Sequence, residues 1–184
     1  WRDILQQQAI LAFPAADPEA LIPLLLYQQV GGVIIGEEED VMLDEIPLQR
    51  SFQIIADGTI ANVFPYWLTE YTTFDQSQQA LIDSSAAYAI VWSSQYLREK
   101  PDNLTITSLP VVENQIMTFA DGWVLAFPQT SSERYTAHLK LAEYLADPEF
   151  NQAWSEAAGV LPVSRTVLSG WSDQRLSNLL IPIA

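Results

Sequence analysis

The sequence predicts an α/β fold, with a central, mostly parallel sheet that helices cover on both faces. Short apolar runs typical of buried strands alternate along the chain with segments that begin on helix-capping residues. No internal repeat and no low-complexity linker interrupts this alternation. Because strands that alternate with helices favour a helix-covered parallel sheet, we expect a single α/β domain over residues 1–184.

In the first half of the chain we expect a strand at 10–13 and helices at 17–30, 47–56 and 76–82. Asp17 and Pro18 supply an N-cap and a first-turn proline for the first of these helices, and Gly31 ends it. The pair Asp57-Gly58 is expected to end the second helix. The segment 62–74 is rich in aromatic residues and shows neither helical nor strand periodicity.

In the second half we expect strands at 86–92, 104–109 and 123–127. Ser131 and Ser132 open the strongest helix of the sequence, whose apolar stripe of Ala137, Leu141, Tyr144 and Leu145 predicts a buried face. Asp147 and Pro148 repeat the cap-plus-proline signal, and Gly159 is expected to end the helix that follows.

Composition excludes several classes of partner. Eight basic and 23 acidic residues give a net charge of −15, which repels phosphate backbones and anionic membrane surfaces. No apolar run reaches the roughly 20 residues of a membrane-spanning helix. We therefore expect no nucleic-acid partner and no direct membrane insertion of this chain.

Catalytic and metal-binding patterns are weak. The chain has no cysteine and one histidine, His138, and it lacks a G-x-S-x-G elbow, a Walker A loop and a G-x-G-x-x-G motif. The acidic run 37–40 lacks the alternating spacing of a calcium loop, so a solvated loop is preferred to a metal site. Paired carboxylates for glycoside hydrolysis remain conceivable because acids are abundant. We expect no enzyme activity, no metal and no cofactor.

Aromatic residues stand at the ends of expected strands. Trp92 ends one strand, and Trp123 opens another directly after Asp121-Gly122. Ligands of open α/β sheets collect at strand ends, and indole rings stack on sugar rings while acids and amides bind the hydroxyl groups. Packing in the core is the alternative explanation for each Trp.

Seven segments resemble, in order, the family 1 extracellular solute-binding proteins of ABC importers, the maltose-binding-protein-like group. They cover nearly the whole chain: WRDI (1–4), LLLYQQVGG (24–32), ALIDSSAAYAI (80–90), LP (109–110), DGWVLAF (121–127), AEYLADPEFNQAW (142–154) and GVLPV (159–163). Leu81 and Ser84 depart from the family pattern of Phe and Gly.

The resemblance implies one lobe, the C-terminal one, of a periplasmic-binding-protein-like type II fold, with the N-terminal lobe absent from these 184 residues. It implies that a small molecule, a carbohydrate, binds between two lobes for delivery to an ABC permease. It also implies an extracellular or periplasmic location with a membrane anchor in a preceding segment. A single lobe offers one wall of the cleft, so we expect very weak binding by this chain alone.

By position, the resemblance assigns ligand contacts to Trp92, Trp123, Asp121, Gly122 and Glu19. Leu21 replaces the aromatic residue that follows the equivalent acid in the family, which weakens the case for a maltodextrin. Whether Phe64, Tyr66 and Trp67 line the cleft stays open. The alternative functions are a lobe of the same fold for a non-sugar solute or a sensor, and an acid-using glycoside hydrolase.

Overall fold

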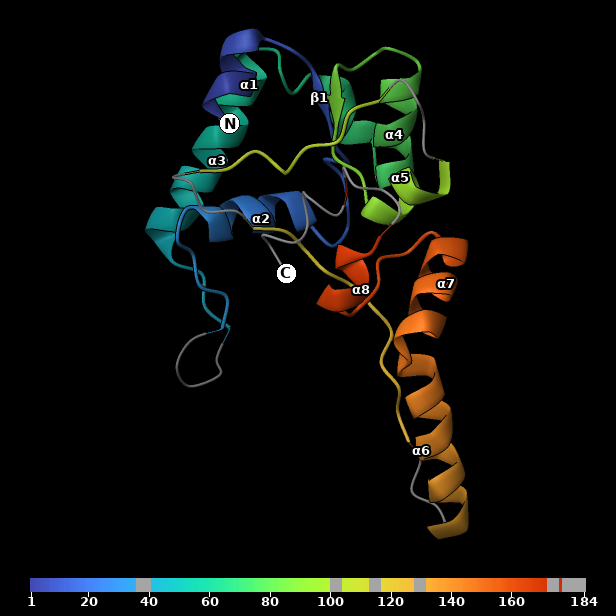
Figure 1. Cartoon of the computed structure of the whole chain (residues 1–184). Coiled ribbons are helices and arrows are strands. Elements are labelled where there is room, and N and C mark those ends of the chain that lie inside the picture. The colour runs from blue at the N-terminus through green and yellow to red at the C-terminus, as the bar shows by residue number, and fades with distance from the viewer. Residues whose placement is uncertain (36–40, 100–103, 113–116, 128–131, 172–175, 177–184) are drawn as a thin grey trace. The chain divides into compact units, whose positions relative to one another are not determined.

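The computed structural model describes residues 1–35, 41–99, 104–112, 117–127, 132–171 and 176, shown in Figure 1. The chain divides into two compact units. Unit 1 comprises Trp1–Trp92 and Ser108–Phe119, and unit 2 comprises Ser93–Thr107 and Ala120–Ala184. The expectation of a single domain over 1–184 stays a prediction.

A short parallel sheet lies in unit 1. Strands β1 (Leu11–Ala12) and β2 (Tyr88–Ala89) pair with Leu11 opposite Tyr88 and Ala12 opposite Ala89. The backbone N–H of Ile90 donates to the carbonyl of Ala12 at 2.9 Å and continues the ladder. The structure thus confirms strands within 10–13 and 86–92, each shorter than expected.

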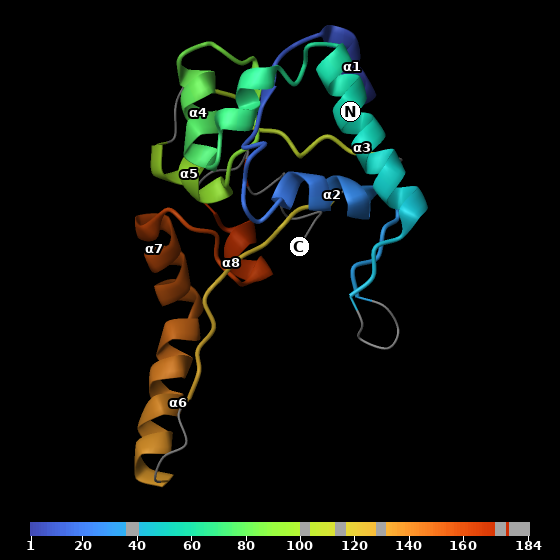
Figure 2. The ribbon, with the colours of Figure 1, turned by 180° about the vertical axis from the view of Figure 1, so that it is seen from behind.

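The helices of unit 1 are α1 (Arg2–Gln7), α2 (Leu21–Gln29), α3 (Glu45–Ile60), the 3₁₀ helix η1 (Tyr66–Glu70) and α4 (Phe74–Ile82). Three of them, α2, α3 and α4, fall near their expected places, whereas η1 lies in the segment 62–74, where no helix was expected; Figure 2 shows the unit from behind. Helix α2 begins at Leu21, four residues later than expected; the Asp17 carboxylate accepts from the N–H of Glu19 in the preceding turn and from the N–H of Leu21, the first residue of the helix.

Aromatic rings organise the core of unit 1. The buried ring of Phe64 meets Trp1 at a centroid distance of 6.0 Å and Phe13 at 5.1 Å, both edge to face. Edge-to-face pairs contribute about 0.5–1.5 kcal/mol beyond the burial of their area. The other buried members of this core are Leu11, Ala12, Ile22, Leu26, Val63, Leu68, Ala80, Ala86 and Ile90.

A buried amide joins three distant parts of unit 1. The indole N–H of Trp1 donates to Oε1 of Gln29 at 3.0 Å, and Nε2 of Gln29 donates to the carbonyl of Pro110 at 3.0 Å. Gln29 is 1% exposed, so loss of either bond leaves a buried polar group without a partner. This bridge fixes the end of α2 against the segment 108–112.

Helix α3 continues through Asp57-Gly58, so the expected helix end at this pair is wrong. Gly58 is buried, and a Cβ atom built on it would overlap the ring of Phe64. The glycine is therefore required by the close approach of the helix to a core aromatic ring, and it does not act as a helix terminator.

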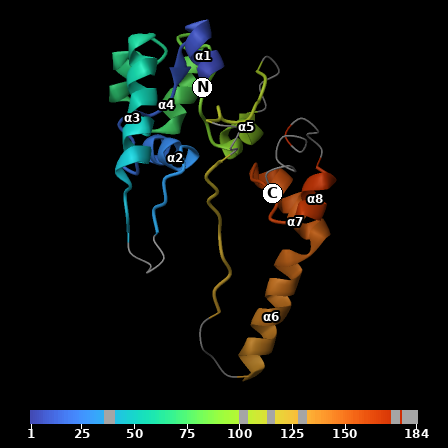
Figure 3. The ribbon, with the colours of Figure 1, turned by 90° about the vertical axis from the view of Figure 1, so that its left-hand side faces the viewer.

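Unit 2 is mostly helical and is seen from another side in Figure 3. It contains α5 (Ser93–Glu99), α6 (Ser132–Ala146), α7 (Pro148–Ala158) and α8 (Arg165–Ser169). The carboxylate of Asp147 accepts hydrogen bonds from the N–H groups of Glu149 and Phe150, and Gly159 ends α7 with a left-handed φ of 66°. The cap-plus-proline and glycine signals are confirmed here.

Unit 2 has a small core of Tyr96, Leu97, Trp171 and Leu176. Two expected strands are not found: neither 104–109 nor 123–127 is a strand in the part of the chain that the structure describes. Residues 104–107 alternate between half-buried and exposed positions as in a strand, but no neighbouring described strand pairs with them. A strand requires such a neighbour for its backbone groups, which explains the error.

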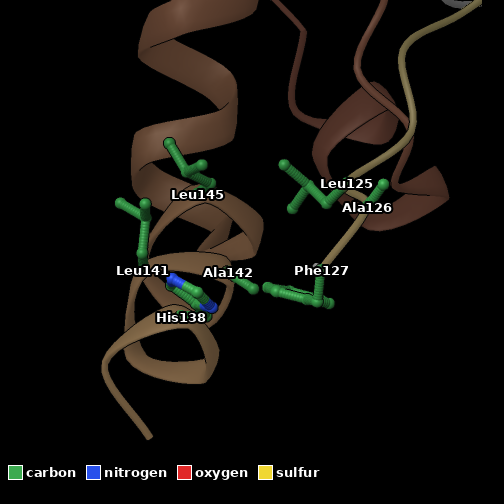
Figure 4. Close-up of a pocket in the computed structure, with 7 residues that line it drawn as sticks. All are labelled: Leu125, Ala126, Phe127, His138, Leu141, Ala142 and Leu145. Carbon is green, nitrogen blue, oxygen red and sulfur yellow. The ribbon is translucent and has the colours of Figure 1, made fainter. Parts of the chain in front are cut away.

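The expected buried stripe of α6 is also largely wrong. Leu141 is 57% exposed and Tyr144 58% exposed, and Ala137 is exposed too. Leu145 is half-buried. The helix itself is confirmed, so the periodicity identified the element correctly, but the described residues cover its apolar side only in part: Leu125 and Phe127 line a pocket with Leu141 and Leu145 (Figure 4).

None of the helices described is both long enough and apolar enough to cross a lipid bilayer.

We predict that Gly58→Ala destabilises the protein by about 1–3 kcal/mol through overpacking against Phe64, although alanine in an ordinary helix position stabilises by about 1 kcal/mol. Urea unfolding followed by circular dichroism measures the change. Gly170→Ala is the control, because its Cβ would meet its nearest neighbour at 3.6 Å, in ordinary contact. A Gly58→Ala variant at least as stable as the wild type would contradict the close approach.

Candidate functional site

The parallel pairing of β1 and β2 brings two loops to one edge of the sheet. Both strands run in the same direction, so the segments 13–20 and 90–92 leave the sheet at its carboxyl edge. In open α/β sheets this is the edge where ligands bind. Glu19 belongs to the first segment and Trp92 to the second, so these two predicted residues follow neighbouring strand ends.

The loop that carries Glu19 is held by its own acid. Oδ1 of Asp17 accepts from the N–H of Glu19 at 3.1 Å, and Oδ2 accepts from the N–H of Leu21 at 3.1 Å. Ala20 adopts a left-handed φ of 52°, which is unfavourable for a residue with a Cβ atom. Asp17 is thus a structural residue of the loop, and the exposed Glu19 is the acid that a ligand could reach.

Two backbone hydrogen bonds attach the same loop to η1. The N–H of Ala15 donates to the carbonyl of Leu68 at 3.3 Å, and the N–H of Ala16 donates to the carbonyl of Tyr71 at 2.9 Å. Next to these bonds, the half-buried rings of Trp67 and Tyr71 lie 5.1 Å apart at an interplanar angle of 56°. An aromatic pair therefore borders the loop that carries Glu19.

Trp92 is half-buried and meets the ring of Phe74 edge to face at 5.5 Å. Phe74 is the first residue of α4, and the side chain of Gln76 accepts from the N–H of Thr73 at 3.0 Å to cap that helix. The cap fixes the start of α4 and hence the ring against which Trp92 rests.

The site in unit 1, which we call the carboxyl-edge site, therefore comprises Glu19, Trp67, Tyr71, Phe74 and Trp92. Sequence reasoning selected Glu19 and Trp92 and missed Tyr71 and Phe74. Both of these lie in the aromatic-rich segment 62–74, but composition alone does not show which of its rings reach the edge of the sheet.

The aromatic residues of 64–67 differ in burial and in their contacts. Phe64 is buried in the core of unit 1, Tyr66 is 83% exposed, and Trp67 packs against the core while it contacts Tyr71. Phe64 is thus a packing residue. A role for Tyr66 or Trp67 at a ligand cleft stays a prediction.

The remaining predicted residues form a second group, in unit 2. Oδ1 of Asp121 accepts from the N–H of Gly122 at 2.8 Å. Trp123 is 76% exposed and its ring meets that of Trp154 edge to face at 5.6 Å. Trp154 comes from α7, where sequence reasoning assigned it no role. A ligand role for Asp121, Gly122 and Trp123 stays a prediction.

Among the described residues, no catalytic constellation forms around His138. The ring of His138 lies parallel to that of Phe127 at 6.2 Å, and no partner for Nδ1 exists among the described residues. No group of three or more potential metal ligands comes together within those residues either. The acidic run 37–40 lies outside the described residues.

Comparison with known proteins identifies the family. The sequence model of the bacterial extracellular solute-binding proteins matches residues 11–175. The chain belongs to this family. This match confirms the expected resemblance to extracellular solute-binding proteins. The family's description is that of extracellular proteins, as expected. No curated protein matches the chain.

Among solved structures, this solute-binding chain is similar to one described as maltose-bound MalE3 of T. maritima, with a TM-score of 0.70 and 18% sequence identity. The match covers 100% of this chain and 52% of that one, so the chain spans about half the length of the protein it matches. The likeness confirms the predicted fold class, a lobe of the periplasmic-binding-protein-like type, with a small parallel sheet.

We predict that Asp17→Ala destabilises unit 1 by about 0.5–2 kcal/mol, because two loop N–H groups lose their acceptor. Thermal or urea unfolding measures the change. Asp57→Ala is the control, because Asp57 is an exposed acid near the end of α3 and its removal is expected to leave the stability nearly unchanged. Asp75→Ala is a poor control because Asp75 lies in the first turn of α4. Equal stabilities for the Asp17 and Asp57 variants would refute the loop-capping role.

Proposed function

We propose that this solute-binding chain is part of the substrate-binding component of an ABC importer and that its ligand is a carbohydrate. The observation that carries the proposal is the carboxyl-edge site of unit 1. An exposed acid and four aromatic rings lie there on the segments that follow the neighbouring strands β1 and β2 or on the segments that border them. The family supports solute binding, and the fold it shares with a maltose-bound protein supports the choice of ligand class.

The chemistry of this edge suits a sugar. Pyranose rings present C–H groups on their faces, which stack on aromatic rings, while their hydroxyl groups donate to carboxylates. Trp92 and Tyr71 are half-buried, so each ring is held by its neighbour and still has accessible surface. Glu19 is exposed and supplies an acceptor on the loop that follows β1.

Asp121, Gly122 and Trp123 are proposed as further ligand contacts, with Trp154 supporting the ring of Trp123. The mechanism is binding without turnover. A ligand that contacts two lobes stabilises the closed arrangement of the hinge, and the permease recognises the closed form. The protein would act outside the cell, and a membrane anchor in a preceding segment remains part of the proposal.

The binding experiments described below also distinguish two other functions. A non-sugar solute or a sensor role would use the same fold with different ligand chemistry. A glycoside hydrolase would need two carboxylates acting on one glycosidic bond. Of the two acids on the loop after β1, Asp17 accepts from two backbone N–H groups, so Glu19 alone is left for a ligand there, which favours binding over hydrolysis.

We predict that the protein expressed from its complete gene binds a mono- or oligosaccharide saturably in isothermal titration calorimetry, and that the 184-residue chain binds it far more weakly. Glucose, maltose and maltotriose are the sugar probes, with spermidine and phosphate as non-sugar probes. Binding of a non-sugar probe alone would overturn the choice of ligand. Release of glucose from maltose would overturn the transport function.

For the sugar that binds, Trp92→Ala is expected to raise the Kd about three- to tenfold, because one stacking contact is worth about 0.5–1.5 kcal/mol. Glu19→Gln should raise the Kd by a similar factor through the loss of a charge-assisted hydrogen bond. Phe52→Ala is the control, since Phe52 is a 56% exposed aromatic residue of α3 outside the site. Equal affinities for all three variants would place the ligand elsewhere.

A further inference from the structure

Unit 1 carries little positive charge, and that charge lies away from the carboxyl-edge site. Arg2 and Arg50 are its only lysine or arginine residues. Nη1 of Arg50 donates to the carbonyl of Val30, which directly follows α2. Arg2 follows Trp1, whose indole donates to Gln29, the last residue of α2. Both arginines are thus attached near the end of α2, whereas the site lies at its start, roughly 13 Å away along the helix and beyond a Debye length of about 8 Å.

The segments at the carboxyl edge of the sheet are acidic. Asp17 and Glu19 lie on the loop after β1, Glu70 is the last residue of η1, and Asp75 is the second residue of α4. Glu19, Glu70 and Asp75 are exposed. No lysine, arginine or histidine occurs in these segments to balance the acids. The electrostatic potential that unit 1 presents to a ligand at this edge is therefore negative.

The start of α2 does not provide an anion site either. The first N–H groups of a helix lack partners within the helix, and together with the helix dipole they bind anions. In α2 the carboxylate of Asp17 already holds this place, since its Oδ2 accepts from the N–H of Leu21, the first residue of the helix, at 3.1 Å. Pro23, in the same turn, has no N–H group. A carboxylate of the chain itself thus neutralises this helix end.

The start of α4 is equally unsuited to an anion. This end lies beside Trp92, because Phe74, the first residue of α4, contacts the Trp92 ring. Oε1 of Gln76 accepts from the N–H of Thr73 at 3.0 Å, and Asp75 adds a negative charge in the first turn. An anion that approached this end would meet an acceptor oxygen and a carboxylate. Both helices that begin at the carboxyl edge therefore carry an acid at their start.

We propose that the carboxyl-edge site selects its saccharide by charge, so that it binds uncharged or cationic saccharides and excludes anionic ones such as uronates and sugar phosphates. Glu19 is the specificity-determining residue, because it is the exposed acid on the loop after β1. Asp17 contributes by neutralising the start of α2. A carboxylate or phosphate on the ligand would lose its water at this edge and gain no cation in return. This inference rests on the proposed function, since it concerns the site proposed to bind the carbohydrate.

Isothermal titration calorimetry on the protein expressed from its complete gene tests the selection with two derivatives of the sugar that binds. The 6-carboxylate and the 6-carboxamide have nearly the same shape and differ in charge. The Kd of the carboxylate should exceed that of the carboxamide at least about tenfold at low salt, and the ratio should shrink at about 0.5 M salt. If neither 6-derivative binds, the aldonate and the aldonamide of the same sugar form the second pair. Equal Kd values within the pair that binds would overturn the proposal.

Charge exchange at Glu19 gives an independent readout. Glu19→Lys should lower the ratio of the two Kd values at least about tenfold, and Glu19→Gln should lower it by a smaller factor. Asp57→Lys is the matched control, because Asp57 is an exposed acid of α3 outside the site and the variant has the same net charge. Its ratio should stay at the wild-type value. The same change of the ratio in both lysine variants would show that net charge acts instead of the site, and would overturn the proposal.

The outcomes separate this inference from the proposed function. Saturable binding of a sugar without preference between the two derivatives retains the function and rejects the charge selection. Binding of spermidine alone rejects the carbohydrate and retains the exclusion of anions. Binding of phosphate alone rejects both.

Discussion

The parallel register of β1 and β2 is the constraint on which the organisation of unit 1 depends. With Leu11 opposite Tyr88, strands that lie far apart in the sequence end side by side. The loop after β1 then lies near η1, and the segment after β2 carries Trp92 to the ring of Phe74. Leu11 and Ala12 are both buried although they point to opposite faces, so a shift of one residue would exchange a large and a small side chain between two packed faces.

Unit 1 supports this small sheet with side-chain bonds, since two strands of two residues each contribute few ladder hydrogen bonds. Gln29 bridges the indole of Trp1 and the carbonyl of Pro110, and Phe64 fills the space between Trp1 and Phe13. Gly58 allows α3 to approach that ring. The core of unit 1 and the carboxyl edge of its sheet are thus built by contacts between distant segments.

Features set by local chemistry could be predicted from the sequence. The cap at Asp147, the proline after it and the glycine at 159 defined α7 at both ends, because capping involves only neighbouring backbone groups. Gly58 was misjudged because its role depends on Phe64. The runs 104–109 and 123–127 have strand composition, but composition does not supply a pairing partner.

The same distinction holds for the candidate site. Trp92 could be placed at a strand end from the order of elements and Glu19 was assigned by the family resemblance, and the parallel pairing puts the segments that carry them at one edge. Tyr71 and Phe74 could not be selected, since their positions follow from the bond between Ala16 and Tyr71 and from the cap of α4. Asp17 was expected to be the N-cap residue of a helix, and it holds the turn before the helix while it also accepts from the N–H of Leu21, the first residue of α2.

Both units contain tryptophan residues, so intrinsic fluorescence can report on each of them. Trp1, Trp67 and Trp92 belong to unit 1, and Trp123, Trp154 and Trp171 to unit 2. Trp1 and Trp171 are buried, so each unit contains an indole shielded from water, while Trp123 is open to solvent. The emission of the native chain should combine a blue component with a red one, and a collisional quencher such as acrylamide should remove the red component first. Unfolding of either unit would expose its buried indole and shift the emission of that unit to longer wavelength.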